Sequence, residues 1–457
     1  MRRAAAGAEV GLLSALTALV DAGPPSVRFG PWRELRRRLM SRPLPVLGAA
    51  DTGGAARVDV GSRELPDPQA EVVLVTGGLG TGGVETVIGM LARDLPGHGV
   101  RTSVLCSAGG ATAEALQNEG IAVREAGDAA TAAACVAQLP AGAVAQLHNA
   151  PEHLIEACQA AGVPIMPVLH TTDINLTPEQ WRRAGRLTDA APVSVAVSEI
   201  VRAFHLRGVP QQPGSPIVVI PNGVEPHPAA AGTAAAARAQ LSDLLRAPLD
   251  QVTLFTCLAR YDIQKNVPGL VSAFLEAAAE RPDLHLIVAG PVTDWLEYRL
   301  ARALCRGHAA GHRVHLMGPS DPHRLLAASD AFVLDSFFEG WAVASSEAVM
   351  AGIPVVVSDT GGAAELVGEQ GSRGYLVGNP AGDPEVMSMP RIRRARRRTG
   401  GQENRSELVD ALRRVHDDVD RWRGRRGDLA ADARSWLGRE MMVSAHAETI
   451  ISVAARS

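Results

Sequence analysis

Lysine is almost missing from this chain of 457 residues. Among its 45 lysine and arginine side chains, only Lys265 is a lysine. A coding bias toward arginine explains the general pattern and carries no information about partners. It makes the one remaining lysine notable, because a compact ammonium and a planar guanidinium are not interchangeable at a fitted site. We therefore expect Lys265 to have a specific role.

Cysteine and aromatic residues are also scarce. The five cysteines are odd in number, lie far apart and form no Cys-x-x-Cys, which fits neither a disulfide framework nor a zinc site and favours a reducing cytoplasm. Aromatic residues make up 4% and hydrophobic residues 46%, so aliphatic side chains must fill the cores. A formal net charge of −4 argues against nucleic acid as the main ligand.

Long uncharged apolar runs are missing as well, so we expect no transmembrane helix. Two arginines precede the apolar stretch Gly11–Val20, as in a signal peptide, but Glu9 and Asp21 bracket it and no small-x-small cleavage site follows. We interpret residues 1–70 as a partly helical N-terminal extension that continues through Pro31–Met40. The expected location is the cytoplasm.

Two stretches of the chain alternate short aliphatic runs with helical segments, residues 71–225 and residues 251–378. Near-continuous apolar strands separated by helices indicate a parallel sheet covered on both faces. The sequence thus predicts an α/β protein with two Rossmann-like, doubly wound parallel-sheet domains that face a cleft. A Pro/Ala/Gly-rich stretch predicts a linker over residues 226–250. The clearest expected strands are EVVLVTG, GAVAQLH, VPIMPVLH, VTLFTCLAR, LHLIVAG, AFVLDS and IPVVVSD.

The alternation stops after Asn379. Residues 379–436 form an arginine-rich insertion, in which six of the eight residues at 391–398 are arginine. We interpret it as a solvated insertion or disordered loop, with peripheral contact to acidic lipid or to a partner as the alternative. An amphipathic C-terminal helix is expected over residues 437–457.

A glycine-rich turn, Gly77–Gly83, follows the first strand and opens a helix. Backbone N–H groups at such a turn can approach an anion at the positive end of the helix dipole, and phosphate is the natural ligand. A dinucleotide-binding domain would also have an acidic residue about 20 residues further on. The second strand ends at Leu105–Ala108 without a carboxylate, which disfavours a nicotinamide dehydrogenase.

Two pairs of charged residues stand at strand ends of the second domain. Arg260 and Lys265 follow its first strand and can converge on one diphosphate, although two solvated surface cations are the alternative. Glu339 and Glu347 straddle a turn and the start of a helix, so both can face one pocket. The segment Ser358–Glu365 follows on the next turn and makes the combination specific.

The ordered set of these motifs resembles the retaining GT-B glycosyltransferases of family four, the group one class. The resemblance covers residues 71–378. It rests on the glycine-rich loop, VAVSE, IPNGV, Arg-x4-Lys-Asn, VAGP, the Glu-x7-Glu segment, AGIPVVVSD and TGGAAE.

The resemblance implies a nucleoside diphosphate sugar as donor, bound without a metal or cofactor. Arg260 and Lys265 would neutralise the diphosphate, Glu347 would bind the ribose hydroxyls, and Glu339 would hold the transferred sugar. His170 would lie near that sugar, whereas the strand-end histidine His148 is a weaker candidate. The donor-binding residues contributed mainly through the backbone would be Gly82, Gly83, Gly340, Trp341, Ala342 and, near the base, Gly318.

One departure from the family pattern affects the sugar pocket. Trp341 and Ala342 replace the small or proline-like residues common after Glu-Gly, so we expect an unusual pocket. The Asp417–Asp420 run is interpreted as a solvated helix face rather than a metal site, and no metal ligand is predicted.

The sequence therefore predicts a retaining glycosyltransferase that moves a sugar from a nucleoside diphosphate donor to an acceptor hydroxyl. The partners would be that donor and a small molecule or saccharide, with a secondary metabolite such as an aminocyclitol preferred. One alternative is a sugar-nucleotide epimerase on a similar fold. The other is a degenerate sugar-nucleotide-binding protein, which the intact charged residues argue against.

Overall fold

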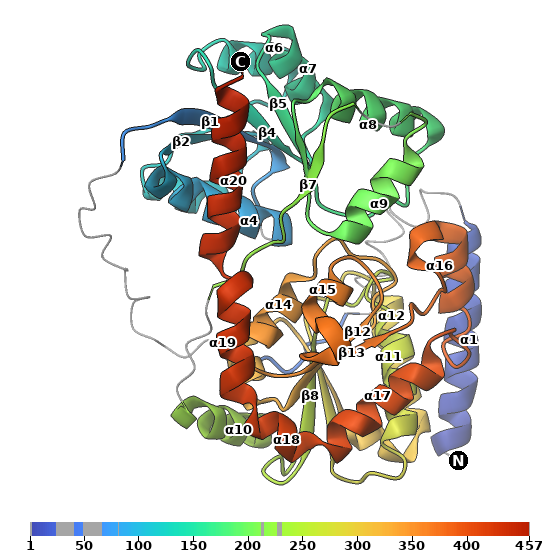
Figure 1. Ribbon diagram of the computed structural model, residues 1–457. Coiled ribbons are helices and arrows are strands. Elements are labelled where there is room, and N and C mark those ends of the chain that lie inside the picture. Colours follow the sequence, from blue (N-terminus) through green and yellow to red (C-terminus); the bar gives the residue numbers. More distant parts are fainter. Residues whose placement is uncertain are drawn as a thin grey trace. The chain divides into compact units, whose positions relative to one another are not determined.

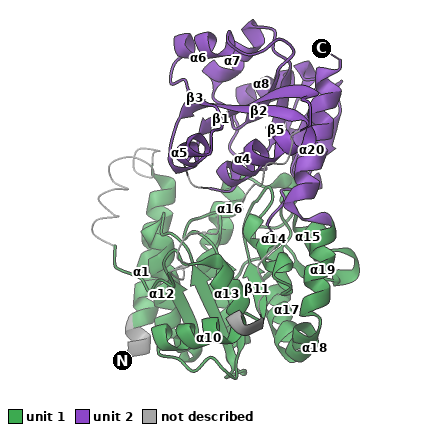
Figure 2. Ribbon diagram, turned by 90° about the vertical axis from the view of Figure 1, so that its left-hand side faces the viewer, with its two compact units in different colours: residues 1–55, 226–435 green, residues 56–225, 436–457 purple. Residues whose placement is uncertain are grey.

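The computed structural model describes residues 2–23, 41–48, 66–80, 82–211, 214–225 and 231–456. The chain divides into two compact units, each built from two separate stretches (Figure 2). Unit 1 comprises residues 1–55 and 226–435, and unit 2 comprises residues 56–225 and 436–457.

Unit 2 contains a seven-stranded parallel sheet in the order β3-β2-β1-β4-β5-β6-β7 (Figure 1). Its inner strand β1 is aliphatic on both faces, and Leu74 and Val75 are fully buried, as a strand covered by helices on both sides requires. The strands are β1 (Ala70–Gly78), β2 (Val100–Ala108), β3 (Val123–Glu125), β4 (Val144–His148), β5 (Ile165–Leu169), β6 (Ser194–Ala196) and β7 (Ile217–Val219). The helices are α4 (Gly83–Asp94), α5 (Ala111–Asn118), α6 (Ala129–Val136), α7 (Glu152–Ala160), α8 (Pro178–Ala190), α9 (Glu199–Gly208) and α20 (Arg439–Ala454).

Unit 1 contains a six-stranded parallel sheet in the order β10-β9-β8-β11-β12-β13. Its strands are β8 (Thr253–Leu258), β9 (Leu284–Ala289), β10 (Val314–Met317), β11 (Ala331–Leu334), β12 (Val355–Ser358) and β13 (Gly374–Val377). Its helices include α1 (Arg2–Ala22), α10 (Ala231–Leu245), α11 (Val267–Ala277), α12 (Trp295–Gly307), α13 (Pro322–Ala328), α14 (Val343–Met350) and α15 (Ala363–Val367). Helices α16 (Met389–Arg396), α17 (Arg405–Asp417), α18 (Val419–Gly424) and α19 (Arg426–Trp436) follow the sheet in the chain.

Each sheet has one point at which the strand order reverses, between β1 and β4 in unit 2 and between β8 and β11 in unit 1. Ligands of doubly wound folds bind at the carboxyl ends of the strands on either side of such a point. The predicted glycine-rich turn follows β1, and the predicted loops with Lys265 and Glu339 follow β8 and β11. The topology therefore places the candidate residues where this fold class binds ligands.

The predicted N-terminal extension is helical over Arg2–Ala22, whereas its described residues 41–48 and 66–69 form neither helix nor strand. Helix α1 packs Leu13 against Leu296 and Leu300 of α12, and Glu9 pairs with Arg306 of the same helix. The expected helix over Pro31–Met40 lies outside the described residues. No helix in the described ranges is long and apolar enough to cross a membrane.

The stretch predicted as a linker over residues 226–250 contains helix α10, which corrects that expectation. Alanine is the strongest helix former, and the alanine-rich stretch Ala231–Leu245 folds accordingly. Leu241 is fully buried in a core that also contains Leu254 of β8.

The arginine-rich stretch is not a disordered loop. Residues 389–436 contain four helices, which lie in unit 1 up to residue 435. In α16, Ile392, Ala395 and Arg396 recur at helical spacing and are buried. Arg396 is only 4% exposed and forms ion pairs with Glu297 of α12 and Asp21 of α1. The other five arginines of residues 391–398 remain wholly or partly exposed.

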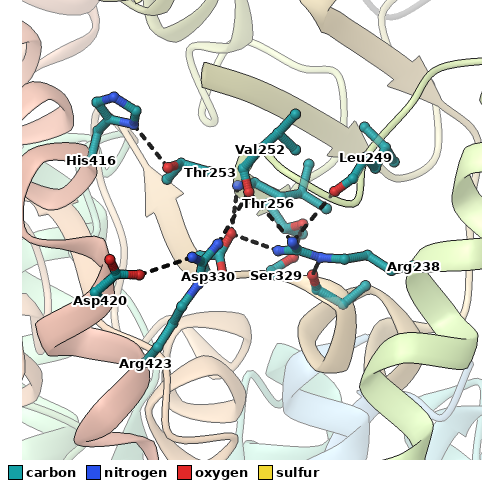
Figure 3. A network of polar contacts seen from close by, with 12 residues as sticks. Arg238, Leu249, Val252, Thr253, Thr256, Ser329, Asp330, His416, Asp420 and Arg423 are labelled. Atoms are coloured by element: carbon teal, nitrogen blue, oxygen red, sulfur yellow. Dashed lines mark hydrogen bonds and ion pairs between the residues drawn. The ribbon is translucent and has the colours of Figure 1, made fainter. Parts of the chain in front are cut away.

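A second polar cluster joins the insertion to the amino-terminal ends of the strands, and Figure 3 shows it around Asp330. Arg238 of α10 donates to Asp330 Oδ2 at 2.6 Å, and Arg423 of α18 donates to Asp330 Oδ1 at 2.8 Å. The backbone N–H of Leu254 donates to the same carboxylate at 2.8 Å. This buried, fully paired carboxylate holds α10 and α18 against the sheet, at the edge opposite the candidate site.

Helix α20 belongs to unit 2, although all of residues 226–435 lie in unit 1. In Figure 1 it lies beside β1 and β4, which it contacts. Val443 and Ile450 are fully buried, and Arg439 at its start pairs with Asp94 of α4. The predicted C-terminal helix is thus an integral part of the sheet's cover.

Candidate active site

The loop after β8 carries both predicted cations. Arg260 is exposed, and its guanidinium donates to Asp262 Oδ2 at 2.8 Å and to Gln264 Oε1 at 3.0 Å. Asp262 also accepts the backbone N–H of Lys265 at 3.1 Å. These local contacts fix the conformation of the loop and hold the Arg260 guanidinium at its solvent-exposed side.

Lys265 and Glu339 form a largely buried ion pair. The lysine Nζ donates to Glu339 Oε1 at 2.5 Å, and the two side chains are 15% and 8% exposed. Gln264 Nε2 donates to Glu339 Oε2 at 3.2 Å. The structure therefore joins Arg260, Gln264, Glu339 and Lys265 into one hydrogen-bonded chain, although residues 265 and 339 lie on different loops.

Hydrogen bonds to the segment that follows β12 fix the loop after β11. The backbone N–H of Glu339 donates to Thr360 Oγ1 at 3.0 Å, and the N–H of Gly362 donates to the carbonyl of Gly340 at 3.0 Å. Glu339, Ala342 and Thr360 line a small crevice within unit 1. The predicted sugar-holding loop is therefore held at Glu339 and Gly340 by the segment that follows β12.

The Trp341 ring packs against Gly362, which has no side chain. Its indole is 5% exposed and donates to Ser346 Oγ at 2.8 Å. A Cβ at Gly362 would lie 2.0 Å from the ring, so no larger residue fits there. Trp341 thus packs beneath the loop, and it can affect the pocket through its backbone.

Glu347 lies on α14 and is separate from the ion pair. Burial raises the pKa of its carboxyl from 4.5 to about 7. Within the described part of the chain, no side chain pairs with this carboxylate. A partly buried carboxylate without a partner is a costly arrangement, which is typical of a group that awaits a ligand.

Gly318 is engaged in a way that the sequence did not predict. Its backbone N–H donates to the carbonyl of Pro45 at 2.9 Å, and a Cβ on it would lie 3.1 Å from Val46. The segment Ser41–Gly48 of the N-terminal extension therefore covers this position. The N–H of Gly318 is thus occupied in this arrangement, and its predicted role near the base stays a prediction.

A buried amide and carboxylate network lies beneath the ion pair, and it was not predicted. Asn266, in the left-handed conformation with φ 48°, donates to Asp335 Oδ2 at 2.8 Å. Gln402 exchanges two hydrogen bonds with Asn266, and Asn404 donates to Asp335 Oδ1 at 2.7 Å. Burial raises the pKa of Asp335 to about 7. The insertion thus holds the loops that carry Lys265 and Glu339.

The predicted residues of unit 2 lie at two strand ends. Gly82 and Gly83 stand at the start of α4, after β1. His170 follows β5, is 8% exposed, and accepts or donates a 2.8 Å hydrogen bond to His148 through Nε2. Burial lowers the pKa of His170 to about 4, so the ring is neutral at pH 7.

No group of three or more His, Cys, Asp or Glu side chains in the described ranges is arranged to hold a metal ion. Asp417, from the acidic run, pairs with Arg281 at 2.9 Å instead.

Two family models match the chain. One, described as Glycosyl transferases group 1, covers residues 247–388, and the other, Glycosyltransferase Family 4, covers residues 81–227. This chain belongs to the family 4, group 1 glycosyltransferases. The Arg260–Lys265 loop and both glutamates lie within the group 1 match, and Gly82, Gly83 and His170 lie within the other.

Curated relatives within the family align over part of their length. The alpha-maltose-1-phosphate synthase of Mycolicibacterium smegmatis is 30% identical over 207 residues, which are 43% of this chain and 51% of that protein. The glycogen synthase of Mycobacterium tuberculosis is 32% identical over 114 residues, 24% of this chain and 27% of that protein. The chain thus spans about half the length, or less, of these relatives.

Solved structures match over nearly their whole length. HepE of Anabaena, crystallised with UDP-glucose, matches with a TM-score of 0.65 at 19% identity. The match covers 84% of this chain and 99% of the HepE chain. A glycosyltransferase of Rickettsia africae has a TM-score of 0.68 at 16% identity, with 85% and 99% covered. At these identities the likeness concerns the fold, and the predicted GT-B fold class is confirmed.

Proposed function

We propose that this family member transfers a sugar from a nucleoside diphosphate sugar to an acceptor hydroxyl with retention of configuration. The Lys265–Glu339 ion pair carries the proposal. It lies at the switch point of unit 1, inside the segment that matches the group 1 family, and it places one buried ammonium beside one buried carboxylate.

Negative charge accumulates on the diphosphate as the glycosidic bond breaks, so fixed cations lower the barrier directly. A cation about 4 Å from a phosphate oxygen contributes about 4 kcal/mol at an effective dielectric near 20, before desolvation is subtracted. Lys265 supplies a point charge, and the exposed Arg260 supplies a fork that can exchange Asp262 and Gln264 for phosphate oxygens.

The two glutamates have different tasks in this proposal. Glu347 is mostly buried and has no partner within the described chain, and an ionised carboxylate can accept two hydrogen bonds from vicinal ribose hydroxyls. Glu339 is held by Lys265 and Gln264. It therefore presents a fixed carboxylate to the sugar rather than a mobile one.

In the reaction, the bond between the anomeric carbon and the diphosphate oxygen breaks. The acceptor oxygen bonds to the same face of that carbon, and the acceptor proton goes to an oxygen of the leaving phosphate. No side chain is required as a nucleophile. The group 1 match supports retention, and this course needs no resident metal or cofactor.

Relatives with known ligands support the choice of donor. HepE was crystallised with UDP-glucose, and the pneumococcal O-GlcNAc transferase GtfA was crystallised with UDP and GlcNAc. A UDP-sugar is therefore the first donor to test. A small acceptor such as an aminocyclitol, and a cytoplasmic location in line with five free cysteines, complete the proposal.

The test combines a donor screen with two matched variants. UDP-, GDP-, ADP- and dTDP-sugars are compared by thermal shift, and release of nucleoside diphosphate is then followed with candidate acceptors in excess EDTA. Glu339→Gln should lower turnover at least tenfold, whereas Glu280→Gln, an exposed glutamate in unit 1, should not.

Three outcomes would overturn the proposal. The first is a product anomer opposite to that of the donor. The second is an EDTA-treated enzyme that needs magnesium or manganese. The third is release of an epimerised donor without any acceptor.

A further inference from the structure

Four buried polar side chains of unit 2 form a continuous hydrogen-bonded chain that ends at His170. His446 of α20 contacts Gln146 of β4 at 2.9 Å, Gln146 contacts His148 at 3.0 Å, and His148 contacts His170 at 2.8 Å. Their exposed fractions are 2%, 0%, 0% and 8%. The chain therefore runs from the covering helix, through the strand at the switch point, to the candidate site.

Such a chain has a direction. A neutral imidazole offers one donor and one acceptor nitrogen, and an amide offers a carbonyl on one side and an NH2 group on the other. Gln146 turns Nε2 toward His446 Nδ1 and Oε1 toward His148 Nε2. His148 must then donate from Nε2 and accept at Nδ1.

The same reasoning assigns the donor and acceptor nitrogens of His170. Because His148 Nδ1 accepts, His170 donates from Nε2, and its Nδ1 carries a lone pair. Burial lowers the pKa of His170 to about 4 and of His446 to about 3, so neither ring is protonated twice at pH 7. A reversed Gln146 amide would reverse every bond and leave His170 with an N–H at Nδ1.

The far end of the chain has no partner. His170 Nδ1 is buried without a hydrogen bond, and so is the hydroxyl of Thr172 two residues on. Burial also raises the pKa of Asp173 to about 6. A buried polar atom without a partner costs about 1–3 kcal/mol, so two such atoms after one strand, beside a partly buried carboxyl, are the mark of a site that a polar ligand completes.

We propose that His446, Gln146 and His148 are positioning residues that hold His170 as its Nε2–H tautomer, so that Nδ1 accepts a hydrogen bond from a sugar hydroxyl. The identity of the ligand as a sugar rests on the proposed function, whereas the tautomer does not. His170 Nδ1 is buried in the free protein, so the groups that cover it must shift slightly when the hydroxyl enters.

The first experiment tests the tautomer in the free protein, independently of any activity. In ¹⁵N-histidine-labelled protein at pH 7.5, His170 should show an unprotonated Nδ1 and a protonated Nε2, with His170→Phe used for assignment. Leucine at position 446 removes the acceptor that orients Gln146, so His446→Leu should shift His170 toward a mixture of tautomers. The amide oxygen of His446→Gln should preserve the wild-type state. A protonated Nδ1 in the wild-type protein would overturn the proposal.

The second experiment tests the consequence by a double-mutant cycle. His446→Leu should lower kcat/KM by about threefold to tenfold, the value of one neutral hydrogen bond, and His446→Gln should recover most of it. In the His170→Phe background, His446→Leu should have no further effect on kcat/KM, even though both variants change the melting temperature. Equal losses in both backgrounds would assign His446 a purely structural role and overturn the proposal.

Separate ligands identify the source of the hydroxyl. The His170 Nδ1 resonance should move with a nucleoside diphosphate sugar and not with the nucleoside diphosphate alone. If it moves only with acceptor, the hydroxyl belongs to the acceptor sugar. If no sugar moves it while the tautomer is as stated, the proposed hydrogen bond from a sugar hydroxyl to His170 is overturned, whereas the proposed function is decided by its own three outcomes.

Discussion

Replacing Glu347 with glutamine should stabilise the free protein and weaken its nucleotide binding. Glu347 lies on α14 with no partner for its carboxylate in the described chain, and burial raises its pKa from 4.5 to about 7. Glutamine has the same shape without the charge, so it removes the desolvation cost and little else. Stability and ligand binding should therefore respond in opposite directions.

The sign of the pH dependence follows from proton binding. Between pH 4.5 and about 7 the folded protein holds a proton on Glu347 that the unfolded chain has released. The free energy of unfolding therefore falls as the pH rises through this window, and the loss is complete above pH 7. The difference between about 7 and 4.5 corresponds to about 3 kcal/mol at roughly 1.4 kcal/mol per pH unit, and solvent at the partly exposed carboxyl reduces it to about 1–3 kcal/mol.

The assay compares melting temperatures of wild type and Glu347→Gln from pH 4.5 to 8. At pH 8 the variant should melt higher, by about 2–4 °C for each kcal/mol in a domain of this size, and at pH 4.5 the two should coincide. Asp335 and Asp173 titrate in the same window, so only the difference between the two proteins isolates Glu347. The exposed Glu280→Gln is the control and should show no such difference.

Calorimetry with the nucleoside diphosphate completes the test. An ionised carboxylate that accepts ribose hydroxyls makes charge-assisted hydrogen bonds, so the variant should bind at least tenfold more weakly. Wild-type affinity should rise from pH 6 to 8, because binding favours the ionised form, and the variant should lose this trend. A variant that is no more stable at pH 8, or a stability difference that is constant with pH, would refute the reasoning.

Two further predictions concern the loops of unit 1. Lys265→Arg should fold normally yet lose nearly as much turnover as Lys265→Ala, because a planar guanidinium cannot keep the 2.5 Å contact with Glu339 and leave the diphosphate in place. A shift of about 1 Å can cost on the order of a hundredfold in rate. Steady-state turnover within a few-fold of wild type would contradict this prediction. Asn404→Leu removes one of the donors to the buried Asp335 and should lower the free energy of unfolding by about 2 kcal/mol. A thermal melting curve measures this loss, and an unchanged curve would show that the network does not hold the loop.

Patterns local in sequence predicted the local features of the molecule. Aliphatic runs alternating with helical segments predicted both parallel sheets, and the loops with Lys265 and Glu339 fall at strand ends as expected. Local patterns do not predict the contact between Lys265 and Glu339, because 74 residues separate the two. Only the family resemblance indicates that both belong to one site. The same limit applied to Arg396: a run of arginines predicts solvent, and only the partner helices with Glu297 and Asp21 explain its burial.

Contacts between distant segments could not be predicted. Gln146 and His446 are 300 residues apart, and neither carries a local signal, since a single glutamine in an apolar strand and a histidine in an amphipathic helix are both common. The Pro45–Gly318 hydrogen bond likewise joins an extension outside the family pattern to a strand end. Periodicity assigns secondary structure, whereas the partners of buried polar groups depend on the tertiary fold.

The return of α20 to unit 2 has a consequence for biosynthesis. Residues 226–435 leave the ribosome after the strands of unit 2 and before the helix that covers β1 and β4. Nascent unit 2 must therefore persist with an uncovered aliphatic face, and with Gln146 lacking its partner His446, while more than 200 residues of unit 1 are made. Domains usually fold in the order of their synthesis, but here the helical cover of the first sheet is completed only after residues 226–435 of unit 1 have been made. Until then, its uncovered strands are a surface for chaperones.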